Sequence, residues 1–172
     1  MFGRSFLLLP GSAGPTPSRK KSEVLWPALT GITLPGDTNR DLIAVLKALP
    51  APASGTLAPF FNTVSDKLNV YNDNASVAFK LNLQGNWTSG STNRSMQLDF
   101  IGTNGTRLVA SRDVAVTSDV ITLATFFSID KNGFIALNGT KPVIRSNGGS
   151  FNVTGILIIA EQVTAETTIS AV

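Results

Sequence analysis

The chain has 172 residues, of which 42% are hydrophobic and 15% are charged, enough for one domain with a real core. Cysteine and histidine are both absent, which excludes disulfides, thiolate metal sites and the commonest general base of enzymes. The net charge of +3 comes from residues 1–60, because residues 61–172 hold eight basic and eight acidic side chains. We therefore do not expect nucleic acid as a partner.

Residues 1–36 predict an extended, basic and apolar N-terminal arm, because five prolines interrupt any helix. Its apolar patches are too hydrophobic for a segment that stays in water. We expect the arm to lie on the surface of another protein, although packing back onto its own domain is an alternative. The predicted partner-binding residues of the arm are Phe6, Leu7, Leu8, Leu9, Arg19, Lys20, Lys21, Leu25 and Trp26.

The basic cluster Arg19-Lys20-Lys21 suits an acidic protein surface or a phosphate group. The apolar run Phe6–Leu9 is shorter than the core of a signal peptide. No stretch reaches the length of a membrane span. We therefore expect a protein made in a cytoplasm, with no membrane partner.

Residues 37–65 predict a short helix followed by a linker. Asp37 or Thr38 can cap the helix and Pro50 ends it. Leu42, Ile43, Leu46 and Leu49 form one apolar stripe that suits packing on a core.

Residues 66–172 predict the main β domain, because the hydrophobic pattern changes to a period of two. The alternation is clearest in residues 77–84 and 96–100, and the run 120–129 is rich in β-branched and aromatic residues. Shorter strands are expected at 108–110, 134–135 and 143–144, and a long one at 151–159.

Four Asn-Gly pairs, which begin at Asn104, Asn132, Asn138 and Asn147, predict tight hairpins between these strands. Six to eight closely spaced strands without intervening helices indicate a mainly β fold. We predict an antiparallel jelly-roll or β-sandwich, with the arm and one short helix outside it.

Enzyme chemistry is poorly supported, so we expect no catalytic residues, no cofactor and no metal. No acidic pair, phosphate-binding loop or dinucleotide fingerprint occurs. Asp130-Lys-Asn-Gly133 resembles the start of a calcium loop, but the rest of that loop is missing and a turn explains it better. Six Asn-x-Ser/Thr triplets are read as polar turn and strand residues, not as glycosylation sites.

Large aromatic residues in the β domain are candidates for contacts between subunits. Trp87, Phe126 and Phe127 are the predicted oligomer or surface contacts. For Trp87, a place at the edge of the core and stacking on a ligand are the alternatives.

The segments Leu81-Asn-Leu-Gln-Gly-Asn-Trp87, Leu98–Thr106, Phe127–Gly133 and Ile156–Ile159 resemble virion proteins of tailed bacteriophages. Capsid decoration (cement) proteins and the knobs of fibres and tail needles have sequences of this style. The resemblance implies a homo-oligomeric, non-catalytic component of the particle, a homodimer or homotrimer.

Two functions follow from this resemblance. We expect a capsid decoration protein that binds the major capsid protein on the outside of the shell, because residues 1–65 contain no repeat that could build a fibre. The alternative is a short tail-fibre or spike head that binds a host receptor.

Overall fold

Alternating apolar and polar residues form the long strands at the centre of the fold. In β6 (Ala75–Trp87), Val77, Phe79, Leu81 and Leu83 are buried, while the residues between them face outwards. This alternation is that of a strand with one face on a core. The predicted pattern of residues 77–84 is therefore confirmed.

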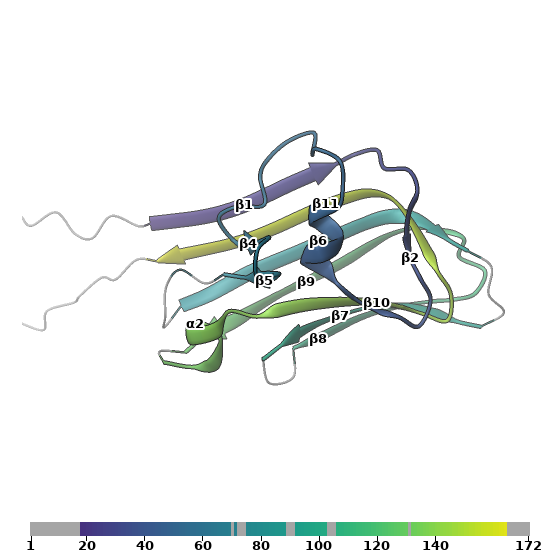
Figure 1. Ribbon diagram of the computed structural model, residues 1–172. Helices are drawn as coiled ribbons and strands as arrows, with labels where there is room; N and C mark the ends of the chain where they lie inside the picture. The colour runs from purple at the N-terminus through teal and green to yellow at the C-terminus, as the bar shows by residue number, and fades with distance from the viewer. Residues whose placement is uncertain are drawn as a thin grey trace, which may run out of the picture.

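The computed structural model describes residues 18–69, 71, 75–88, 92–102, 106–130 and 132–164 as two antiparallel sheets that pack face to face (Figure 1). The larger sheet has the order β1-β11-β6-β9, with β2 also paired to β11, and the smaller has the order β3-β10-β7-β8. A small hairpin pairs β4 with β5. The bounds are β1 Ser18–Trp26, β2 Ile32–Leu34, β3 Asn39–Asp41, α1 Leu42–Lys47, β4 Phe61–Asn62, β5 Lys67–Leu68, β7 Arg94–Ile101, β8 Arg107–Arg112, β9 Ser118–Ile129, α2 Phe134–Asn138, β10 Lys141–Asn147 and β11 Phe151–Thr164.

The core lies between the two sheets. The rings of Phe79 in the larger sheet and Phe100 in the smaller sheet meet edge to face, with centroids 4.9 Å apart. Trp87 and Phe151, which are paired on the neighbouring strands β6 and β11 of the larger sheet, also meet edge to face, with centroids 4.9 Å apart. The chain crosses from one sheet to the other between β6 and β7, β8 and β9, β9 and β10, and β10 and β11, as it does in a jelly-roll. The prediction of a mainly β, antiparallel jelly-roll is confirmed.

A β-bulge in β11 decides which of its side chains enter the core. The pairing of β11 with β6 shifts between Val153 and Gly155, so that Thr154 is the extra residue. Before the bulge Val153 faces the core, and after it Ile156 and Ile158 do. The bulge therefore reverses the alternation part of the way along the strand.

Part of the predicted arm belongs to the larger sheet. β1 pairs with β11 over nine residues, from Ser18 with Thr164 to Trp26 with Ile156. β2 pairs with the other end of β11. The structure thus supports the alternative that this stretch packs on its own domain, because β11 offers a free edge that β1 fills. The boundaries at residues 36 and 65 remain predictions.

The helix α1 and the chain after it cover the side of the sandwich where β1 is an edge strand. Asp41, and not Asp37 or Thr38, caps α1, since its carboxylate accepts hydrogen bonds from the N–H groups of Ile43 and Ala44. The Trp26 Nε1 donates to the carbonyl of Pro50 at 2.8 Å, and Ser22 Oγ donates to the carbonyl of Leu57 at 3.0 Å.

The prediction of a strand at 134–135 and three of the hairpin predictions are wrong. Phe134 and Ile135 begin the helix α2, so the described residues contain two short helices instead of the one predicted. Asn132 precedes this helix with a φ of 60°, and Gly139 ends it with a φ of 67°. Asn147-Gly148 links β10 to β11, which lie in different sheets. Asn-Gly supplies a positive φ, and a helix end uses it as readily as a hairpin does.

The hairpin predicted at Asn104-Gly105 lies outside the described residues, but the strands on either side of it, β7 and β8, do pair. Neither of the two helices found in the described part of the chain is long and apolar enough to cross a membrane.

A methyl group at Gly85 tests the close packing of β6 on β11. A Cβ there would lie 2.1 Å from the carbonyl oxygen of Asn152 and 2.8 Å from the Phe151 ring. We expect Gly85→Ala to lower the free energy of unfolding by about 1–3 kcal/mol, measured by urea denaturation. Gly149→Ala is the control, because its nearest contact is an ordinary 3.4 Å. Equal effects of the two substitutions would contradict this packing.

Candidate subunit interface

The larger sheet exposes a second, outward face whose side chains alternate with those of the core. We call this surface the outer face. Its residues are Lys21, Glu23 and Leu25 of β1, Ala78, Lys80, Asn82 and Gln84 of β6, Val120, Thr122, Ala124 and Phe126 of β9, and Leu157, Ile159 and Glu161 of β11. These residues stand beside one another in register across four strands.

Large apolar side chains are exposed on the outer face. Phe126 is 77% exposed, Val120 58% and Leu25 36%. Leu25 stands beside the half-buried Leu157 in the register of β1 and β11. Exposed aromatic and aliphatic groups gathered on one face mark a surface that packs against another molecule.

A groove of about 240 Å³ in the outer face contains a buried hydrogen-bond acceptor. Leu25, Gln84, Val120 and Leu157 are among the residues that line it. Oδ1 of Asn82, which also lines the groove, is buried and accepts no hydrogen bond from the described residues. Leaving such an atom unsatisfied costs about 1–3 kcal/mol. A donor from a second molecule seated on this face would remove that penalty.

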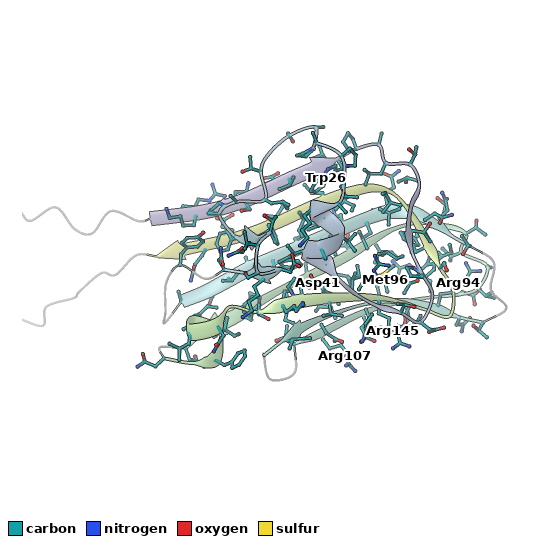
Figure 2. All side chains as sticks on the ribbon, viewed as in Figure 1. Trp26, Asp41, Arg94, Met96, Arg107 and Arg145 are labelled. Atoms are coloured by element: carbon teal, nitrogen blue, oxygen red, sulfur yellow. The ribbon has the colours of Figure 1, made fainter. Side chains whose placement is uncertain are left out.

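The outward face of the smaller sheet is different in chemistry. Arg107 pairs with Asp99 at 2.7 Å, and Lys141 pairs with Asp41 at the same distance. Arg107 and Arg145 project from the smaller sheet on the side away from the larger one (Figure 2). Paired charges of this kind suit a surface that stays in water, because removing them from water is costly.

An ion pair marks the edge of the outer face beside β1. Arg19 Nε lies 2.6 Å from Oε1 of Glu161, and Arg19 Nη2 lies 2.8 Å from Oε2. The hydrogen bonds from Arg19 lower the pKa of the Glu161 carboxyl, because they stabilise its ionised form. They raise the pKa of the Arg19 guanidinium in return.

The predicted partner-binding residues are spread over different environments. Phe6, Leu7, Leu8 and Leu9 lie outside the described residues. The Lys20 ammonium lies 5.7 Å from the centre of the Tyr71 ring, and Lys21 pairs with Glu23. Together with Arg19, these lysines lie on strand β1.

Burial within the single chain separates the aromatic candidates. Phe126 lies on the outer face, whereas its neighbour Phe127 is 6% exposed and lies in the core. Trp26 is 3% exposed and Trp87 5%. For Trp87 the structure supports a place at the edge of the core. Of the predicted contacts, Leu25 and Phe126 are therefore the apolar ones that the larger sheet presents outwards.

The sequence analysis overlooked Asn82, Val120, Leu157 and Ile159 as members of this surface. A signal for them was present, because residues 156–159 are apolar at four consecutive positions. A strand alternates its side chains between two faces, so a continuous apolar run means that both faces are covered.

The fold and this surface together indicate a class of protein. The larger sheet exposes Leu25, Val120 and Phe126 among polar residues of its outer face. The outward face of the smaller sheet carries ion pairs such as Arg107 with Asp99. No group of three or more acidic side chains placed to hold a metal occurs among the described residues. The chain is a jelly-roll module with a surface suited to assembly.

Comparison with known proteins identifies the family. Residues 18–162 match the family model described as the Sf6-type phage tail needle knob or tip of some Caudovirales. The chain belongs to this family, and it is a virion protein of a tailed phage.

The tail needle protein of Shigella phage Sf6 is 53% identical over 146 residues, which make up 84% of this chain and 50% of that protein. The chain thus spans about half the length of this relative. Among solved structures, the vertex protein P5 of PRD1 covers 86% of this chain and 73% of its own, with a TM-score of 0.50 and 11% identity. That likeness concerns the fold alone.

The prediction of a capsid decoration or cement protein is wrong, because the family is one of tail needle knobs. The major capsid protein is not supported as a partner, and the location is the tail, not the capsid exterior. The error came from the missing fibre repeat in residues 1–65. The absence of such a repeat does not discriminate between a decoration protein and a needle knob, since the match covers only 50% of the Sf6 tail needle protein.

Removing the carboxylate of Glu161 tests the ion pair with Arg19. The folded state lowers the pKa of this carboxyl, so the stability it contributes is present above the ordinary pKa of a glutamate and is lost as the pH falls through the folded value. We expect Glu161→Gln to lower the urea midpoint at pH 7 and to have a smaller effect near pH 3. In an Arg19→Gln background the pH-dependent difference should vanish. A difference that is the same at both pH values would refute the assignment.

Proposed function

We propose that this chain forms the tip of a phage tail needle, where copies of it associate and meet the host surface. The observation that carries the proposal is the family match, which covers nearly the whole described sandwich from β1 to β11. The role is one of structure and binding, and no catalytic step is part of it. A spike head of this kind was the alternative function that the sequence left open.

The outer face of the larger sheet is the surface through which we propose that the copies associate. Phe126 and Val120 supply apolar area that water would otherwise cover, at about 25 cal/mol for each Å² buried. The groove at Asn82 supplies an acceptor for a donor of the neighbouring copy. We propose a second copy as the occupant, because the exposed Phe126 and Val120 and the Asn82 acceptor without a described donor all lie on this one face.

With this arrangement the charged face of the smaller sheet points outwards. Arg107 and Arg145 lie on it with their partners Asp99 and Asp37. The paired charges of this face can exchange bound water for polar groups of a partner. This is the face that we propose to present to the host.

A substitution on each face tests the oligomer. We expect Phe126→Ser to raise the dissociation constant of the assembly at least about tenfold, because it removes the exposed aromatic side chain of the outer face. Val109→Ser is the matched control, since Val109 is 52% exposed on the outward face of the smaller sheet. Sedimentation equilibrium measures both. Equal dissociation constants for the two variants would exclude the outer face as the interface.

Binding to host cells tests the role as a tip. We expect the fluorescently labelled chain to bind intact cells of a strain that the phage infects, to saturate, and to slow adsorption of phage particles. Cells of a resistant strain that does not adsorb the phage are the control. Equal binding to the two strains would contradict recognition of the host by this domain.

A further inference from the structure

A second apolar surface lies at one end of the sandwich, away from the outer face. We call it the end patch, and it consists of Ile101, Phe134 and Leu137. These side chains are 55%, 58% and 72% exposed. Phe134 and Leu137 are one turn apart on α2 and so share one side of it. The Phe134 ring lies against Gly102, where a Cβ would come within 2.2 Å of it.

A pocket of about 290 Å³ adjoins the end patch. Phe134 is part of its lining, together with Phe127 and Ile135 from the edge of the core. The carboxylate-bearing Asp130 also contributes to the lining. The end of the sandwich therefore combines exposed apolar groups, a hollow and a negative charge.

The chain enters the sandwich at this same end. Ser18, the first residue of β1, stands opposite Thr164, the last residue of β11, and α2 lies at the same end of the molecule (Figure 1). Seventeen residues precede Ser18, and they include the apolar run Phe6–Leu9 and the basic Arg4. Twelve residues separate Phe6 from Ser18, a reach of up to about 40 Å.

We propose that residues 6–9 of each chain cover the end patch of that same chain. The apolar run and the apolar patch match in chemistry, and Arg4 beside the run complements Asp130 beside the patch. Covering the patch removes apolar surface from water at a low entropic cost, because the two segments belong to one chain. This inference does not depend on the function proposed above.

Disulfide trapping tests the contact. Because the chain has no native cysteine, only the introduced cysteines can form the disulfide. The test variant of the full chain carries Leu8→Cys and Leu137→Cys. These two cysteines can form a disulfide only when their Cα atoms come within about 7 Å of each other. The control pairs Leu8→Cys with Ala115→Cys, an exposed position in the turn between β8 and β9 at the opposite end of the sandwich. We expect the first pair to form an intrachain disulfide at least about tenfold faster than the control.

Other outcomes of this experiment overturn the proposal. A disulfide that joins two chains would show that the run covers the patch of a neighbouring copy. Equal rates for the two pairs would show that the patch is not its site. The intrachain rate is measured across protein concentrations, so failure of the proposed oligomer leaves this test intact.

Hydrogen exchange gives a second readout without cysteines. We expect the double substitution Phe6→Ser with Leu8→Ser to speed amide exchange in α2 at least about fivefold, while exchange in the central strand β6 is unchanged. Unchanged exchange in α2 would contradict the contact even if the cysteine variants fail to fold.

Discussion

The larger sheet has to accommodate apolar side chains on both of its faces, and most of the structure follows from this constraint. Its inner face fills the core with Val77, Phe79 and Leu81 of β6. Its outer face still carries Val120 and Phe126, which remain exposed in the single chain. In an antiparallel sandwich one face of each sheet commonly meets water, and that face is then polar. The outer face mixes polar residues with these apolar ones, and the single chain leaves Val120 and Phe126 uncovered.

The strand β11 connects this constraint to the rest of the sandwich. Because of the bulge at Thr154, odd-numbered residues such as Val153 face the core before it and even-numbered residues such as Ile156 face the core after it. Thr154 also makes a hydrogen bond outside the pairing of β11 with β6, because its carbonyl accepts the N–H of Leu29 at 2.8 Å. β11 then offers its other edge to β1, and the loop after α1 covers the exposed edge of β1 through the hydrogen bond from Leu25 to Ser54. The edges of β11 and β1 are thus covered by segments that precede the β domain predicted from the sequence.

Period-two alternation was sufficient to predict the long strands and the jelly-roll, because burial on one face leaves a direct trace in the sequence. It was not sufficient for β1, where only Val24 and Trp26 follow the alternation and prolines flank the strand. Three of the four Asn-Gly pairs failed as hairpin signals, because such a pair indicates a backbone angle and not the element that uses it. Phe126 and Phe127 show the limit for the site. The sequence marks both as large and apolar, but only the register of β9 with β6 decides which one enters the core.

The chemistry of the surface explains why a decoration protein and a needle tip resemble each other in sequence. Either function would call for neutral or apolar surface that other subunits can cover, and the charged pair of Arg107 and Asp99 suits a surface that stays in water under either one. The composition therefore indicates that the chain assembles with other subunits. It does not indicate which assembly the chain joins. The family match supplies that information, because residues 18–162 match the tail needle knob family and the chain is 53% identical to a tail needle protein over 146 residues. The structure adds that Val120 and Phe126 are exposed on the outer face of the larger sheet, which is why we propose this face for the contact between copies.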